Sequence, residues 1–366
     1  MNRYLLAGCA AVALAMASGA ANAQAKFEVK VGGDVLVEGG WVDEDLAPAG
    51  GRETELRNRW RLNVIPSAKA DNGLEYGARL RLRMGPAATA SVNNPNAGTG
   101  SDIDRDRAFL FVQSAALGQL RLGETNSFND DTGVVRPFDY LPLGIYNISA
   151  GWTTGENPHW PFLDQNGNAS KIVYYSPRFA GLQLGASYTP RNNNFGLAVD
   201  RASDVVTTAT LSDAIEVGAN YNATFGGFGV KASAGYMWAD VTGAGGIVGI
   251  DDLKSWQFGG QVSYAGFAVG GGYTNYGRVA NVETNKLWNA GAQYTMGPII
   301  AGVGYTHATG GAAGVDTTKI YEVGASYTVA PGLSVGASYH FVNVDGTTAA
   351  TDNDANVVLL RSVLAF

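Results

Sequence analysis

The amino-acid sequence predicts an all-β protein, a transmembrane antiparallel β-barrel of sixteen strands. Three observations carry this prediction. Apolar residues alternate with small or polar residues along most of the chain, which is the period of a β-strand. Nothing after the N-terminal leader approaches the roughly 18 consecutive apolar residues of a membrane helix. Charged residues make up only 16% of the chain, against about 25% in an average protein.

The N-terminus has the composition of an export signal. Arg3 supplies a short positive region, an apolar run follows over residues 5–20, and residues 21–23 (Ala-Asn-Ala) fit the pattern of a cleavage site. We therefore expect residues 1–23 to be a cleaved signal peptide and residues 24–366 to form a single barrel domain. The segment before Cys9 resembles a lipoprotein cleavage box, but nearly all of the apolar run follows Cys9, which argues against lipidation. Cys9 is the only cysteine, so the cleaved chain has no thiol for a disulfide or a metal.

Length and charge restrict the class of protein further. A chain of 366 residues suggests two soluble domains, but one barrel can use that length. The formal net charge of −7 gives no support for a nucleic-acid partner. If the chain crosses lipid with strands, the sheet has to close, because every backbone group must be paired inside the hydrocarbon.

A short phrase recurs in the second half of the chain. It is LGASYT at Leu184, VGANYN at Val217, VGASYT at Val323 and VGASYH at Val335, each within an alternating run of about ten residues. Tyrosines and tryptophans fall toward the ends of these runs, as lipid-facing aromatic girdles do. A soluble β-sandwich or propeller is the alternative. The continuous polar face, and the lack of a blade-like repeat of about 40 residues, weigh against it.

The alternation and the turns between the runs define sixteen strands. They are expected near residues 27–39, 54–65, 73–84, 104–114, 118–124, 169–177, 181–190, 213–225, 227–239, 254–265, 266–277, 286–296, 298–308, 318–330, 332–343 and 356–366. An even number is expected of a bacterial barrel. Short turns such as Phe225–Phe228 and Ala330–Leu333 alternate with long loops rich in Gly, Asn, Asp and Thr.

Two neighbouring predicted strands carry arginine at every second position. On the outer face of a membrane barrel each arginine would cost roughly 2–4 kcal/mol near the midplane, and three would cost about 6–12 kcal/mol. That is comparable with the whole stability of an ordinary domain. The opposite register puts Leu80, Leu82 and Met84 into lipid. We therefore predict a basic wall facing a water-filled lumen, which a sixteen-stranded barrel is wide enough to hold. Its residues are Arg57, Arg59, Arg61, Arg79, Arg81, Arg83 and Arg121, with Arg105 and Arg107 as further candidates.

The longest stretch without strand alternation runs from about residue 124 to 168. A loop of this length is usually functional. It is rich in aromatic residues, among them Phe128, Trp152 and Phe162, so we expect it to fold against another part of the protein.

Several features together resemble the Gram-negative outer-membrane general porins, which are trimeric sixteen-stranded barrels, and most closely the alphaproteobacterial type. They are the leader, the strand pattern over the whole chain after it, and the segment DRAFLFVQSAALGQLRLGET (Asp106–Thr125), which looks like the porin hairpin before the long third loop. The last strand, NVVLLRSVLAF, ends on Phe366. A terminal aromatic of this kind is recognised by the assembly machinery of outer-membrane barrels. The loop lacks the PEFG motif of enteric porins.

The resemblance implies a passive channel for small hydrophilic solutes and ions in the bacterial outer membrane. It also implies a homotrimer in contact with outer-membrane lipids and lipopolysaccharide. In porins the long third loop folds into the lumen, narrows it and sets its acids against a basic wall. The resemblance therefore implies that the long third loop of this chain is folded into the lumen, with Glu124, Asp130, Asp131 and Asp139 on the acidic side of the constriction. Such opposed charges guide ions. The arginine excess favours anions and the net charge favours cations, so selectivity stays open.

Two alternatives to a general channel remain. One keeps the fold and makes it a substrate-selective channel for anions, phosphate or sugars. The other is a barrel that serves as the scaffold of an outer-membrane enzyme or adhesin, although no P-loop, G-x-S-x-G or H-E-x-x-H motif occurs. His159, His307 and His340 lack zinc spacing, and we expect no cofactor. Carboxylates of the loops could hold calcium. These are Asp102, Asp104 and Asp106, and Asp352 with Asp354.

Overall fold

The computed structural model describes most of the chain after the leader. The described residues are 26–47, 51–84, 103–137, 152–154, 161–163, 166–192, 196, 210–242, 251–279, 282–283, 286–310 and 315–366. Within them, sixteen antiparallel strands form one closed barrel, which confirms the predicted fold class. The expected signal peptide lies outside the described residues, as do parts of the expected long third loop, so the prediction that this loop folds into the lumen stays a prediction.

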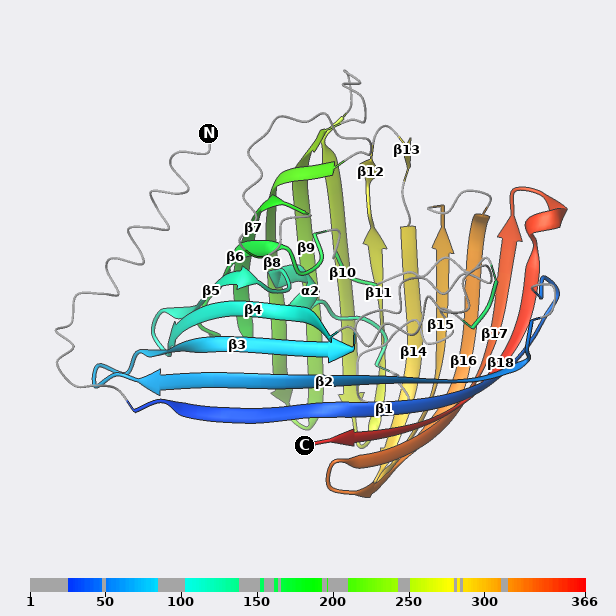
Figure 1. Cartoon of the computed structure of the whole chain (residues 1–366), viewed down its shortest axis with the longest axis horizontal. Helices are drawn as coiled ribbons and strands as arrows, with labels where there is room; N and C mark the ends of the chain where they lie inside the picture. Colours follow the sequence, from blue (N-terminus) through cyan, green and yellow to red (C-terminus); the bar gives the residue numbers. More distant parts are fainter. Residues whose placement is uncertain are drawn as a thin grey trace.

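The strands are long and follow one another around the ring (Figure 1). The barrel strands are β1 (Glu28–Glu44), β2 (Thr54–Lys69), β3 (Glu75–Met84), β4 (Ile103–Ser114), β5 (Gly118–Glu124), β6 (Ser170–Tyr175), β7 (Leu182–Arg191), β8 (Thr210–Phe225), β9 (Phe228–Thr242), β10 (Leu253–Tyr264), β11 (Phe267–Asn275), β14 (Lys286–Met296), β15 (Ile299–Thr309), β16 (Val315–Ala330), β17 (Leu333–Gly346) and β18 (Asn353–Ala365). The short strands β12 (Arg278–Val279) and β13 (Val282–Glu283) form a separate two-stranded sheet.

Helical structure is confined to short pieces in the described residues. These are the α-helix α2 (Phe128–Thr132) and the 3₁₀-helix η2 (Ala349–Thr351). No helix in the part of the chain that the structure describes is long and apolar enough to cross a membrane.

The ring closes between the first and the last strand. β1 and β18 pair in antiparallel register from Asp34 opposite Ala365 to Glu44 opposite Ala355. The chain end takes part, because Gly33 N donates to Phe366 O (2.8 Å) and Phe366 N donates to Gly33 O (3.0 Å). Figure 1 shows β1 and β18 side by side, with the C-terminus next to β1. Closure leaves the barrel without an open sheet edge.

Exposure alternates along the strands as the sequence predicts. In β3, Leu80 is 47% exposed and Arg81 is 9% exposed; in β18, Leu360 is 63% exposed and Arg361 is 2% exposed. Large exposed apolar side chains therefore share one face of the sheet, called the apolar face here, and residues such as Arg81, Ser187 and Arg361 share the other, the polar face. A broad exposed apolar band is what a membrane barrel presents to lipid.

Turn chemistry explains the tight hairpins. Between β8 and β9, Gly226 and Gly227 both have positive φ (54° and 89°), and between β10 and β11, Ala265 and Gly266 do (48° and 85°). Two consecutive residues with positive φ match the turn that fits the twist of an antiparallel hairpin. The predicted short turn at Phe225–Phe228 is confirmed.

The observed strands agree with the predicted ones to within a few residues, with one instructive difference. β1 continues to Glu44, whereas the sequence predicts its end near residue 39, before a second glycine. Gly40 does not end the strand. A Cβ atom there would lie 2.5 Å from the Trp152 ring, so the glycine makes room for a side chain from another segment.

Candidate functional site

The register of β2, β3 and β4 stacks their arginines on the polar face. Arg61 lies opposite Arg83 in the pairing of β2 with β3, and Arg81 lies opposite Arg107 in the pairing of β3 with β4. Like charges this close repel, so the arrangement needs carboxylates, counter-ions or water between them.

Carboxylates that lie between the arginines are each shared. Asp106, whose side chain is 1% exposed, pairs with Arg81 and lies 3.3 Å from Arg83. Glu38 is fully buried and pairs with Arg57 (2.5 Å) and with Arg361 of β18. At each of these two places, one carboxylate thus compensates the charge of two guanidinium groups.

The other arginines of these strands have weaker compensation. Arg59 lies 3.5 Å from Asp34. Arg79 donates to the neutral amide oxygen of Asn63 from Nε (3.0 Å) and from a terminal nitrogen (2.8 Å). Arg61 makes no ion pair within 4 Å to any described residue. The buried Nε atoms of Arg59, Arg61 and Arg107 have no acceptor among the described groups.

We call the described arginines of β2, β3, β4, β5 and β18, with the carboxylates that pair with them, the arginine wall. It contains nine described arginines and four described carboxylates, so positive charge is in excess. Its members are Arg57, Arg59, Arg61, Arg79, Arg81, Arg83, Arg107, Arg121 and Arg361, with Asp34, Glu38, Asp106 and Asp131. All seven predicted basic residues belong to it; the side chain of Arg105 lies outside the described residues.

Asp131 is the acid that the long segment contributes to this wall. It accepts a hydrogen bond from Arg121 (2.5 Å) and one from the Tyr175 hydroxyl (2.8 Å), and it lies 4.0 Å from Arg107. Burial alone would raise the pKa of Asp131. The Arg121 and Arg107 guanidinium groups and the Tyr175 hydroxyl outweigh that burial and hold the pKa below its ordinary value. The carboxylate is therefore charged at neutral pH.

The remaining predicted acids lie elsewhere. Glu124 is the last residue of β5, is 4% exposed, and accepts a hydrogen bond from Gly196 N (2.6 Å). Asp130 is in the first turn of α2, where its backbone N donates to the Ser127 side chain (3.2 Å), the N-cap of the helix. Asp139 lies outside the described residues. Of the four predicted acids, the structure brings Asp131 against the arginines.

The helix that carries Asp131 is seated on glycines of the barrel. A Cβ atom at Gly185 would lie 1.9 Å from the Phe128 ring, and Phe128 is fully buried. Phe128 N donates to the Ser187 hydroxyl (2.8 Å), and Asn129 Nδ2 donates to the buried Glu216 (3.2 Å). The strands β7 and β8 therefore fix α2 by shape and by hydrogen bonds.

The residues after α2 reach strands much further around the ring. Val134 N donates to the Ser233 hydroxyl of β9 (2.7 Å), and Arg136 N donates to Asn289 of β14 (2.8 Å). The Arg136 side chain forms a buried ion pair with Glu322 of β16 (2.5 Å). Residues 128–136 thus contact the polar face from β6 to β16.

Several contact residues were not predicted from the sequence. Asp34, Glu38 and Glu322 are each flanked by small, apolar or aromatic residues in alternating strands, and Asn63 and Tyr175 have unremarkable neighbours in the sequence. Their partners come from other strands or from the long segment. The one signal that could have identified the acids is an ionisable residue at an otherwise small or apolar position of a barrel strand.

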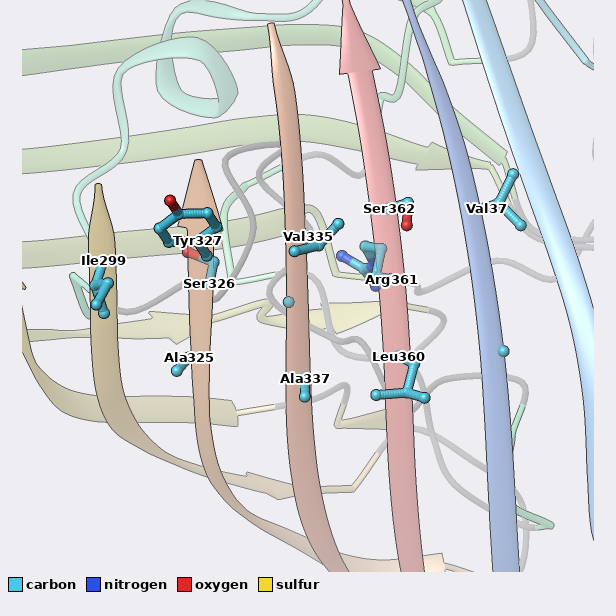
Figure 2. A pocket seen from close by; sticks show the side chains of 12 residues that line it. Val37, Ile299, Ala325, Ser326, Tyr327, Val335, Ala337, Leu360, Arg361 and Ser362 are labelled. Atoms are coloured by element: carbon cyan, nitrogen blue, oxygen red, sulfur yellow. The ribbon is translucent and has the colours of Figure 1, made fainter. Parts of the chain in front are cut away.

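Two hollows differ in lining. One of about 680 Å³ is polar and lies beside Arg121, Asp131 and Tyr175. The other, of about 560 Å³, lies on the apolar face over β1 and β15–β18, where apolar side chains such as Ile299, Val335 and Leu360 line it (Figure 2).

The predicted calcium ligands give no cluster in the described part of the chain. Asp106 is bound by arginines and by Asn168 (3.1 Å), and Asp352 accepts a hydrogen bond from Gly346 N (2.8 Å). Among the described residues there is no group of three His, Cys, Asp or Glu side chains that could hold a metal ion. Asp102 and the side chain of Asp104 lie outside the description, as does His159.

Comparison with known proteins gives a family and a set of similar folds. The model of a family described as Gram-negative porin matches residues 10–347. An engineered Rhodobacter blastica porin is 18% identical, with a TM-score of 0.58, and the match covers 93% of this chain and 100% of that one. An anion-selective porin from Comamonas acidovorans is 16% identical (TM-score 0.64; 93% and 100% covered).

An outer membrane protein of Vibrio cholerae lacking one loop is also 16% identical (TM-score 0.60; 93% and 99% covered). At these identities the solved structures show the fold alone. No curated protein matches.

Proposed function

Because the chain belongs to the Gram-negative porin family, we propose that it forms a water-filled channel for passive diffusion of small hydrophilic solutes and ions. Family and fold are those of a non-enzymatic outer-membrane channel. The observation that carries the finer proposal is the arginine wall with Asp131 set against Arg121 and Arg107.

In this proposal residues 128–136 lie inside the barrel and narrow the lumen. The contacts of these nine residues support it, since they extend from Tyr175 of β6 to Glu322 of β16. A short segment can reach strands on such distant parts of a closed ring only from inside it. The polar hollow beside Asp131 would then belong to the path of the solute.

The charge of the wall favours anions at the narrowest point. Nine arginines against four carboxylates leave a positive field where an ion passes. The buried Nε atoms of Arg59, Arg61 and Arg107 could donate to an anion or to water. The solved porin from Comamonas acidovorans, which is described as anion-selective, has a similar fold.

Export by the leader, residence in the outer membrane with its lipids and lipopolysaccharide, and assembly as a homotrimer complete the proposal. They rest on the composition of residues 1–23, on the barrel fold and on the family.

The test is the single-channel current of the purified protein in a planar bilayer under a gradient of potassium chloride. We expect large stable steps and a reversal potential of the sign that chloride preference gives. A potassium preference would overturn the role of the arginine wall and leave the channel itself intact. A current that phosphate or a sugar blocks saturably would favour the substrate-selective alternative. Absence of steps from a demonstrably folded barrel would overturn the channel and favour a scaffold function.

A further inference from the structure

The polar face carries an apolar patch where the barrel closes. Leu36 and Val42 of β1 are 4% and 9% exposed, and Val357, Leu359 and Val363 of β18 are 0%, 0% and 3% exposed. They form one cluster with Trp152 of the long segment. Apolar side chains on a face that otherwise carries charges stay buried only if protein covers them.

The indole of Trp152 fits this patch closely. Its ring packs over Gly40, where a Cβ atom would lie 2.5 Å from the ring. Its Nε1 donates to Glu38 Oε1 (3.0 Å), and the Arg57 guanidinium lies 5.1 Å from the ring centroid. We call this site the seam dock. It consists of Leu36, Glu38, Gly40 and Val42 of β1 with Val357, Leu359, Arg361 and Val363 of β18.

The acceptor of the indole N–H is shared by three strands. Glu38 of β1 also accepts from Arg57 of β2 (2.5 Å) and from Arg361 Nε of β18 (2.6 Å). Removing any donor would leave a buried carboxylate less well compensated. The complete acceptor exists only where the first, second and last strands lie together, so the seam dock is a property of the closed barrel.

The next residues of the segment are held at the same place. Thr154 N and Thr154 Oγ1 donate to Glu44 (2.7 and 3.1 Å). Asn353 of β18 donates to Thr154 O (2.7 Å) and to Glu44 (2.8 Å). The hydrogen bonds therefore tie residues 152–154 to both strands of the closure.

The seam dock and the strands that hold α2 lie on different sides of the ring. In the strand order, β1 and β18 are separated by several strands in either direction from β7 and β8, which hold α2. The segment that brings Asp131 to the arginine wall is thus anchored at points that lie far apart on the polar face, and the seam dock is one of them.

We propose that Trp152 is a positioning residue of the channel: its docking between β1 and β18 fixes residues 152–154 of the segment that begins at α2 and thereby sets one steady conductance. This rests on the proposed channel function. Trp152 and Glu38 act on the path through the segment and need not touch the solute.

The test compares two adjacent glycines of β1. Gly40→Ala places a methyl group against the Trp152 ring, whereas at Gly39 a Cβ atom would lie 3.1 Å from the flexible end of Leu56 on the apolar face. Both proteins are first shown to be folded by their heat-dependent mobility in detergent gels. We expect Gly39→Ala to conduct as the wild type does. Gly40→Ala should occupy secondary conductance levels about ten times more than the wild type.

A second variant removes the hydrogen bond and keeps an aromatic ring. Trp152→Phe loses the donor to Glu38, and we expect a smaller increase in secondary levels in a barrel that still folds, because Glu38 keeps both of its arginine partners. This variant is also the test if the Gly40→Ala protein does not assemble. If a folded Gly40→Ala barrel and Trp152→Phe both keep the single steady level, the seam dock does not position the segment. A wild-type protein without current would overturn the channel function itself.

Discussion

At residue scale, adjacent residues of β3 lie in opposite environments: one side chain faces lipid and the next lies among the charged groups of the polar face. Leu80 is 47% exposed on the apolar face, while its neighbour Arg79 bonds to the neutral Asn63. Leu80→Arg should destabilise the barrel by roughly 2–4 kcal/mol. Arg79→Gln should fold as the wild type does, because no buried carboxylate loses its partner, and should lower the anion preference. The folded fraction in denaturant and the reversal potential measure the two effects; equal folding of both variants would contradict the assignment of the faces.

The lowered pKa of Asp131 gives a pH prediction at the same scale. A depressed folded pKa means that the stability from its ion pairs is complete above the ordinary value of about 3.9 and is lost only as the pH falls through the lower folded value. We therefore expect the difference in selectivity between the wild type and Asp131→Asn to stay constant from about pH 7 to pH 5. Reversal potentials over this range measure it. A difference that vanishes by pH 5 would show that the pKa of Asp131 is raised above its ordinary value, which would contradict the lowered pKa.

At the scale of the element, the position of α2 depends on a glycine of the barrel wall. Phe128 is fully buried against Gly185, so Gly185→Val should displace α2 and separate Asp131 from Arg121. Loss of the packing of one buried aromatic costs about 3–5 kcal/mol. This loss should destabilise the position of the segment and not the barrel, because the hydrogen bonds between the strands persist. We expect a folded barrel with changed conductance and faster proteolysis after residue 127. Ala186→Val, on the exposed face of β7, is the matched control and should behave as the wild type does.

The strands could be predicted from the sequence, whereas the contacts of the segment could not. Alternation with a period of two is a local signal, and it fixes both the sixteen strands and the side of each residue, as at Leu360 and Arg361. The predicted end of β1 was wrong by several residues: the strand continues through Gly40, which leaves room for the ring of Trp152, a residue far away in the sequence. Trp152 itself was predicted to be an anchor among other aromatic residues, but nothing local in the sequence connects it with Glu38.

At the scale of the whole molecule, closure and charge distribution act together. Pairing of β1 with β18 follows from the requirement that no backbone group be left open in lipid. It also brings Arg361, near the end of the chain, to Glu38, near its start. The sequence predicted the closure, but the apolar patch beneath Trp152 became visible only when the two ends were placed together.

The contrast between the wall and the rest of the chain predicts an unusual salt dependence. The arginine wall is positive although the chain as a whole has a net charge of −7, so the remainder is more acidic than the whole. Charges act over about 30 Å at 0.01 M salt and about 10 Å at 0.1 M. Distant acids should therefore oppose the wall at the lowest salt, and screening should remove their effect before it weakens the wall.

We expect the anion preference to rise between about 0.01 M and 0.1 M potassium chloride and to fall again toward 1 M, where charges act over only about 3 Å. Reversal potentials at one fixed concentration ratio and several mean concentrations measure this dependence. Arg79→Gln is the matched variant, since it weakens the wall and leaves the distant acids unchanged, so its maximum should be lower. A preference that falls steadily from the lowest salt would mean that the distant acids do not reach the path of the ion.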